Sequence, residues 1–207
     1  MNNRDDWQIL DSVTLFKNPH IEIRQERVIP PGESRIRDWT ISLRKKAVVI
    51  APVTAEGKFV LVRQARIPVR KFLWEFPAGQ VDNSSDPDLA TLESTALREL
   101  EEETGYTLTS DGALTFLGHY YTSQGFTDET PHLFLATPVK MTGRGAAPDD
   151  GESIVDCAEF SLDELRTMID EYVIQDANTL AFFARLVCRF AVGGSELKLL
   201  PLQDRGR

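Results

Sequence analysis

The sequence has few of the residues that would support disulfide, zinc or membrane chemistry. Its 207 residues include only two cysteines, Cys157 and Cys188, and three histidines, none of which have the spacing of a zinc site. No stretch approaches the roughly 20 apolar residues of a membrane-spanning helix, and the first residues lack the apolar run of a secretory signal. We therefore expect a protein of the reducing cytoplasm that has no membrane partner.

Basic residues are also scarce relative to acidic ones. The 23 Lys and Arg residues against 32 Asp and Glu residues give a formal net charge of −9. This charge repels nucleic acid and anionic membranes, so we expect neither as a partner. An anionic small molecule could still bind where carboxylate-held metal ions and a few placed arginines neutralise it.

The hydrophobic pattern predicts a mixed α/β chain. Short alternating runs between residues 7 and 46 predict small antiparallel strands, and two β-rich runs at 46–53 and 58–64 predict a hairpin. Further strands are expected at 114–121 and 131–139, before a loop from Thr142 to Gly151. We divide the chain into an N-terminal β region at 1–46, a main domain at 47–192 and a C-terminal tail at 193–207.

Three helices are expected. The first has Asp86 as its N-cap and Pro87 at its first helical position, and it ends at Gly105. Two more helices are predicted at about 161–171 and 176–191.

The first predicted helix ends in a cluster of glutamates. Glu99, Glu102 and Glu103 fall at i, i+3 and i+4 on one face, whereas Glu101 points away. Oxygen ligands of this kind suit Mg²⁺, and a bound cation would relieve their mutual repulsion. Arg98, four residues before Glu102, is placed to orient that carboxylate by a salt bridge. The alternative interpretation of such a run is a solvated acidic helix end.

Two segments together resemble the Nudix box. The run from Arg98 to Tyr106 reads Arg-Glu-Leu-Glu-Glu-Glu-Thr-Gly-Tyr, and a turn that ends at Gly79 precedes it. The resemblance implies a Nudix fold, with a mixed β-sheet sandwiched between helices and a small N-terminal antiparallel β region. It also implies hydrolysis of a pyrophosphate bond in a nucleoside diphosphate compound, with Mg²⁺ as cofactor and Mn²⁺ as a substitute. The implied metal ligands are Glu99, Glu102, Glu103 and the backbone of Ala78, and the implied catalytic residues include Glu102 and Arg98.

The box departs from the family pattern in its first half. Eighteen residues separate Gly79 from Arg98 where the family has 13, and Ala90 stands where the family has its first glutamate. We assign no role to the nearby Glu93. This departure leaves open a second class of function, a non-catalytic Nudix module that senses nucleotides.

Residues outside the box resemble the ADP-ribose and ADP-sugar pyrophosphatase branch. That resemblance implies that Arg66, Glu75 and Glu129 contact the substrate. Gln124 takes the place of a proline found in that branch. ADP-ribose, cleaved to AMP and ribose 5-phosphate, is the leading substrate; GDP-mannose-type compounds and noncanonical nucleoside triphosphates remain alternatives.

Two further residues complete the expected site. Trp39 could stack on the nucleobase, although ordinary burial in a β core is an equal alternative. Glu152 lies where the branch has a late glutamate that acts as metal ligand or general base; its alternative is a solvated loop acid. The resemblance also implies a homodimer in which the N-terminal strands complete the partner's base pocket.

Overall fold

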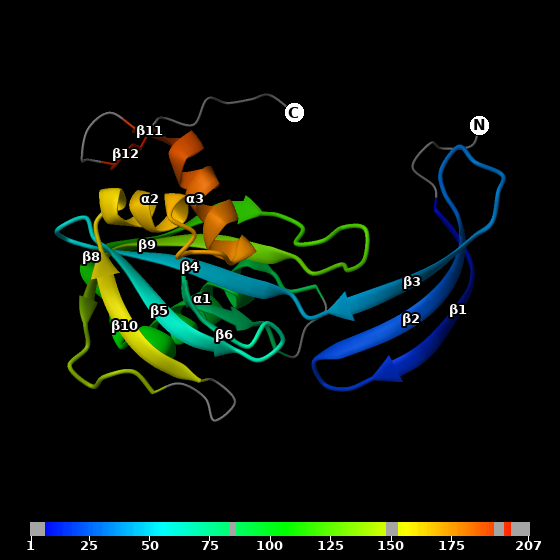
Figure 1. Cartoon of the computed structure of the whole chain (residues 1–207), viewed down its shortest axis with the longest axis horizontal. Helices are drawn as coiled ribbons and strands as arrows, with labels where there is room; N and C mark the ends of the chain where they lie inside the picture. The colour runs from blue at the N-terminus through cyan, green and yellow to red at the C-terminus, as the bar shows by residue number, and fades with distance from the viewer. Residues whose placement is uncertain (1–6, 83–85, 148–152, 193–196, 200–207) are drawn as a thin grey trace.

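The structure is a computed structural model, which describes residues 7–82, 86–147, 153–192 and 197–199. Its N-terminal part is a three-stranded antiparallel sheet in the order β1-β2-β3. In Figure 1 this sheet lies to one side of the main body and joins it where β3 leads into β4. The strands are β1 (Gln8–Lys17), β2 (Ile21–Ile29) and β3 (Arg37–Arg44).

The main body is built on a seven-stranded mixed sheet. Its order is β10-β5-β4-β9-β8, with β6 paired to β5 and β7 paired to β4. The β4–β9 pair is parallel and the remaining pairs of this sheet are antiparallel. The strands are β4 (Ala47–Thr54), β5 (Phe59–Arg66), β6 (Lys71–Glu75), β7 (Ala78–Gln80), β8 (Tyr106–His119), β9 (Pro131–Met141) and β10 (Ile154–Phe160).

Helices cover both faces of this sheet, because its central strands are apolar on both sides. Along β4, Val48 and Ile50 pack with α1 (Leu89–Thr104), whereas Val49 and Ala51 pack with α2 (Leu162–Asp170) and α3 (Ala177–Arg189). Figure 1 shows α2 and α3 on one side of the sheet and α1 behind it. The predicted fold class is therefore confirmed.

The start of α1 corrects the sequence prediction. Asp88, and not Asp86, is the N-cap, and its side chain accepts a hydrogen bond of 2.9 Å from the Thr91 backbone N–H. Pro87 therefore lies before the helix rather than in its first turn. The end of the helix agrees with the prediction, since Gly105 has a φ of 73° in the left-handed region that favours glycine.

Four strands extend the prediction. β8 begins at Tyr106, directly after α1, and β10 was not anticipated at all. Near the C-terminus, β11 (Phe190–Val192) pairs with β12 (Leu197–Leu199). No helix in the described ranges is long and apolar enough to cross a membrane. The division at residues 46 and 192 stays a prediction.

Candidate active site

The C-terminal half of α1 carries two glutamates that are buried beneath β7. Glu99 is 5% exposed and Glu103 is 1% exposed. The backbone N–H of Ala78 donates a 2.9 Å hydrogen bond to Oε2 of Glu103. A Cβ on Gly79 would lie 2.0 Å from Cδ of Glu99, so only glycine allows β7 to approach this carboxylate so closely. The turn before the box and the box helix thus meet as the sequence predicts.

Arg98 connects the buried and exposed carboxylates of this face. Its guanidinium donates to Oε1 of Glu99 at 2.6 Å and to Oε2 of Glu102, so the salt bridge expected from the four-residue spacing is present. Burial opposes the charge of Arg98, but Glu99 and Glu102 outweigh it and raise the pKa of the guanidinium. Arg98 therefore orients both carboxylates at once.

Negative charge is concentrated at the end of α1. Its last turn contains no basic residue, although the helix dipole favours cations at that position. Glu101 points away from the patch and lies 3.8 Å from the exposed Arg144. The Ala147 backbone N–H donates a 2.8 Å hydrogen bond to the Glu102 carbonyl, which links the loop after β9 to this helix end. A bound cation would complete the compensation.

The available donors fit a hard divalent cation in kind. Glu99, Glu102 and Glu103 offer only carboxylate oxygens, which are the ligands that Mg²⁺ prefers. Within the described ranges, no three His, Cys, Asp or Glu side chains stand ready to hold a metal ion as they are placed. Arg98 engages oxygens of both Glu99 and Glu102, and Glu152 lies outside the described residues. Metal ligation by these residues and by Ala78 stays a prediction.

Arg66 and Glu75 form a paired site at the edge of β5 and β6. Nε of Arg66 lies 3.0 Å from Oε1 of Glu75, and Nη2 lies 2.5 Å from Oε2. Burial opposes the charge of Arg66, but Glu75 outweighs it, with Glu103 and Asp176 acting in the same direction, so the pKa of Arg66 is raised. Glu75 also lies three residues before Ala78, whose backbone N–H is hydrogen-bonded to Glu103, so a short segment of chain joins the pair to the carboxylate face of α1.

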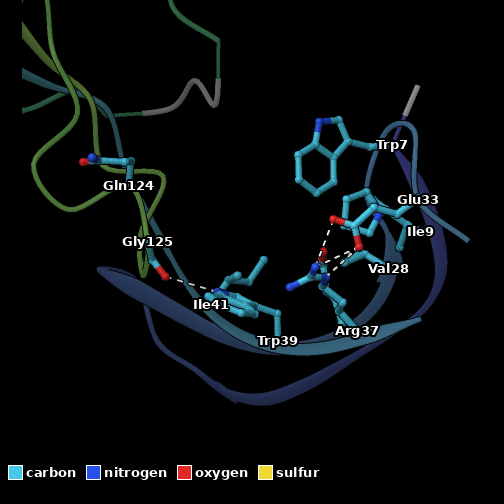
Figure 2. Close-up of a pocket in the computed structure, with 11 residues that line it drawn as sticks. Trp7, Ile9, Val28, Glu33, Arg37, Trp39, Ile41, Gln124 and Gly125 are labelled. Carbon is cyan, nitrogen blue, oxygen red and sulfur yellow. Dashed lines mark hydrogen bonds and ion pairs between the residues drawn. The ribbon is translucent and has the colours of Figure 1, made fainter. Parts of the chain in front are cut away.

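Trp39 lines a cavity on the N-terminal sheet and is not part of a core. It is 48% exposed, and its indole N–H donates a 3.1 Å hydrogen bond to the Gly125 carbonyl. The cavity holds about 580 Å³, and Figure 2 shows Trp7 on its far side from Trp39. The Arg37–Glu33 ion pair, with N and O atoms 2.8 Å apart, also lines it. An apolar slot with one ion pair suits a planar heterocycle.

The remaining predicted residues lie apart from these groups. Glu129 is held by Arg44 at 3.3 Å and by the Thr122 hydroxyl at 3.0 Å, near the base of the N-terminal sheet. The residues that line the Trp39 cavity do not include Arg66, Glu75 or the α1 carboxylates. Among the described residues of one chain, the cavity and the carboxylate face are therefore two separate places.

Comparison with known proteins decides the family. A model of the NUDIX domain matches residues 43–183. The chain belongs to the NUDIX family. This Nudix hydrolase is 36% identical to the ADP-ribose pyrophosphatase of Bacillus subtilis (strain 168) over 166 residues, which cover 80% of this chain and 84% of that protein. It is 38% identical to the methanol dehydrogenase activator of Bacillus methanolicus over 167 residues, again 80% of this chain and 84% of the relative.

One solved structure and one further sequence relative agree with the Nudix assignment. The crystal structure of an ADP compounds hydrolase superimposes with a TM-score of 0.70 over 89% of this chain and 94% of that chain, at 16% sequence identity. An ADP-ribose pyrophosphatase of Mycobacterium tuberculosis (strain ATCC 25618 / H37Rv) is 31% identical over 142 residues, 69% of this chain and 65% of that protein. The expectation of a Nudix hydrolase is thus confirmed.

The sequence analysis did not single out two residues that the structure brings to these places. Trp7 lines the cavity with Trp39, and the only sequence signal is its position at the start of the β region. Asp176 acts on Arg66 from the N-terminus of α3, where the order Asp-Ala-Asn-Thr could have indicated an N-cap. No local sequence pattern indicates that Asp176 lies near Arg66.

Proposed function

We propose that this Nudix hydrolase cleaves the pyrophosphate bond of ADP-ribose and releases AMP and ribose 5-phosphate. The observation that carries the proposal is the carboxylate face of α1, in which Arg98 joins Glu99 to Glu102 and β7 covers Glu103. The Arg66–Glu75 pair lies beside this face, so a diphosphate could meet a cationic side chain there. Two relatives over most of their length are ADP-ribose pyrophosphatases, which favours this substrate.

The chain's own residues divide the work as follows. Glu99, Glu102 and Glu103, with the Ala78 backbone and Glu152, would hold Mg²⁺, or Mn²⁺ in its place. When bound, the metal neutralises the diphosphate and lowers the pKa of a bound water. Glu102 is the more exposed of the three helical carboxylates, with 32% of its side chain accessible, so we assign it to accept the proton of the attacking water. Arg98 fixes the position of that carboxylate.

The nucleobase would occupy the cavity beside Trp39. An indole face stacks well on a planar base, and the cavity volume of about 580 Å³ lies within the usual range for small-ligand sites. Glu129, held near the base of the same sheet, would contact the remainder of the nucleotide. We assign these contacts to Trp39 and Glu129, and the contacts to the diphosphate region to Arg66 and Glu75.

We further propose a homodimer that brings the two places together. Every residue of β1 is exposed in the single chain, including Ile9, Leu15 and Phe16, each more than half exposed. Exposed apolar side chains gathered on one edge strand support an interface at that edge. A second copy would cover β1 and set its N-terminal sheet against the partner's carboxylate face. The double variant Leu15→Asp with Val13→Asp would then be monomeric in light scattering; an unchanged dimer, or a monomeric wild type, would reject this arrangement.

The test of the activity is a hydrolysis panel with a matched pair of variants. Wild type is given ADP-ribose, ADP-glucose, GDP-mannose, NADH and nucleoside triphosphates, each with Mg²⁺ and with EDTA. We expect metal-dependent release of AMP from ADP-ribose. Glu102→Gln should lower kcat on the order of 100-fold. Glu101→Gln is the control, since Glu101 lies on the same turn but points away from the patch.

Other outcomes identify the alternatives. Preferred turnover of GDP-mannose or of a nucleoside triphosphate would replace ADP-ribose as substrate within the same chemistry. Binding of nucleotides without any turnover would favour the sensing module and point to Ala90, where the family's first glutamate is missing. We place the protein in the reducing cytoplasm, in keeping with the free thiols of Cys157 and Cys188.

A further inference from the structure

The N-terminus of α3 is fixed against the turn that follows β6. The hydroxyl of Thr179, which is fully buried, accepts a 2.9 Å hydrogen bond from the backbone N–H of Phe76. One turn later along α3, the rings of Phe182 and Phe76 pack with centroids 5.3 Å apart. Because Phe76 directly follows Glu75, these contacts set the first turn of α3 at a defined position relative to the Arg66–Glu75 pair.

Asp176 caps this helix and leaves one carboxylate oxygen unused. Its Oδ2 accepts a 2.8 Å hydrogen bond from the Thr179 backbone N–H. Its Oδ1 is buried and, in the part of the chain that the structure describes, is the one buried side-chain nitrogen or oxygen without a hydrogen-bond partner. Burying an unsatisfied acceptor is unfavourable, and burying an ionised one is more so. The position beside Oδ1 of Asp176 is therefore one that a proton would fill favourably.

The groups that act on Asp176 come from two strands and from the segment after β8. Arg66 of β5 attracts its negative charge and Glu75 of β6 repels it. Burial raises the pKa of Tyr120, which follows β8, and Asp176 adds to this effect. Two further carboxylates act on these neighbours: Glu103 of α1 raises the pKa of Arg66, and Glu129 raises the pKa of Tyr120. Burial is the largest influence on Asp176 itself and raises its pKa to about 6, with Glu75 adding to the effect.

The charge of the cluster therefore depends on one proton. With Asp176 ionised, Arg66, Glu75 and Asp176 together carry one net negative charge, which opposes an anionic ligand. With Asp176 protonated, the three side chains are neutral in sum, so their net repulsion of phosphate is removed. The hydrogen bonds to Glu75 use Nε and Nη2 of Arg66, which leaves Nη1 for a further acceptor.

We propose that Asp176 is a positioning residue for the Arg66–Glu75 pair and that it takes up a proton when a diphosphate ligand binds there. The proton fills the position at Oδ1 and removes the repulsion between Asp176 and the arriving phosphates. This inference rests on the proposed function only in that Arg66 contacts the diphosphate. It makes ligand affinity weaken as the pH rises through the neutral range.

The test measures proton uptake directly and does not depend on turnover. The probe is α,β-methylene-ADP with saturating Mg²⁺, because its bridging carbon cannot be hydrolysed. Isothermal titration calorimetry at pH 6.5 in PIPES and in imidazole gives the protons taken up per ligand. We expect about half a proton or more in wild type, and an affinity that falls about three- to tenfold between pH 6 and pH 8.

Asp176→Asn is the decisive variant, since asparagine can still cap the helix but cannot titrate. It should bind with almost no proton uptake and with an affinity that changes little with pH. Asp88→Asn is the matched control, an N-cap aspartate of α1 that should behave like wild type. If Asp176→Asn does not fold, Asp176→Ser caps by its hydroxyl and replaces it in the test.

Three results overturn the inference: no proton uptake by wild type, equal uptake by wild type and Asp176→Asn, or no binding of the diphosphate probe. A role of Asp176 in folding alone would lower the melting temperature without altering the pH dependence of binding. Failure of the proposed function is separate, because it would be seen as absent hydrolysis of ADP-ribose in the panel while the probe still binds with proton uptake.

Discussion

Arg66 reaches along the β5–β6 hairpin to Glu75, although its backbone partner across the ladder is Lys71. The backbone partner of Glu75 is Val62, so the guanidinium extends over the intervening pair of residues to contact Glu75 at 3.0 Å. Residues 62, 64 and 66 share one face of β5, which makes this contact geometrically direct. The consequence is a buried carboxylate that forms its ion pair with a side chain that is 39% exposed.

Removing Arg66 should therefore affect both stability and binding. Arg66→Ala leaves Glu75 buried without its cation, and we expect a loss of about 2–4 kcal/mol in the free energy of unfolding. Arg66→Lys keeps the charge but not the two-point contact. It should raise KM for the nucleotide and lower the free energy of unfolding only slightly. Urea denaturation and steady-state kinetics measure the two effects.

Arg63→Ala is the control for this prediction. Arg63 lies on the same strand, but its guanidinium packs 5.6 Å from the ring of Phe72 at the surface. Its loss should change the free energy of unfolding by less than about 1 kcal/mol. Equal destabilisation by both alanine variants would show that the Arg66–Glu75 pair has no special role.

Gly79→Ala should disturb the carboxylate face from the opposite side. The added methyl group would overlap the carboxylate of Glu99, which must then move away from β7 and from Arg98. We expect a loss of about 1–3 kcal/mol in stability and a reduced affinity for Mg²⁺ in activity titrations. Gly125→Ala is the stability control, because its Cβ would meet no atom within 4 Å, and it should shift stability by less than about 0.5 kcal/mol.

Trp39→Ala should weaken binding of the nucleotide with little effect on folding. Stacking on an aromatic side chain contributes about 1–3 kcal/mol per base, so KM should rise about five- to 100-fold. Trp39→Phe should restore most of the affinity while it loses the hydrogen bond to Gly125. The distant and exposed Tyr172, changed to Asn, provides a comparison that should leave KM as in wild type. An unchanged KM in Trp39→Ala would show that the base does not bind in this cavity.

The pKa of Asp176 also predicts how stability changes with pH. The folded-state pKa of about 6 lies above the ordinary value of 3.8, so folding favours the protonated form. The contribution of Asp176 to stability is complete below about pH 4 and is lost as the pH rises to about 6. At pH 7, Asp176→Asn should be more stable than wild type by on the order of 2–3 kcal/mol, and the difference should vanish in acid. Urea denaturation at pH 4 and pH 7 tests this, and a variant less stable than wild type at pH 7 would contradict it.

The sequence predicts best what depends on local periodicity. The face shared by Glu99, Glu102 and Glu103 follows from the helical repeat, and so does the contact of Arg98 with Glu102. The beginning of α1 was misplaced, because Asp86-Pro87 and Asp88 both carry helix-start signals and only the hydrogen bond to Thr91 decides between them. β10 was missed because its partly buried and exposed residues do not alternate regularly, so the period of two that indicates a strand is absent.

Long-range relationships were beyond the sequence. The residues that bring α3 to the end of β6 are Thr179 and Phe76, and no local pattern connects them. The same holds for Asp176 beside Glu75. The apolar alternation of the N-terminal strands predicted a sheet, but not that β1 would be exposed along its whole length. Tertiary placement, not composition, determines these features.

The central sheet separates two cores, so each core can be changed by mutation independently of the other. Leu100 and Phe134 belong to the core under α1, whereas Leu165 and Leu186 belong to the core under α2 and α3. Substitutions without shared neighbours usually add in their effects. Stabilising core substitutions beneath α2 and the later turns of α3 should therefore raise thermal tolerance without disturbing the carboxylate face, which offers a route to durable variants that keep their catalytic geometry.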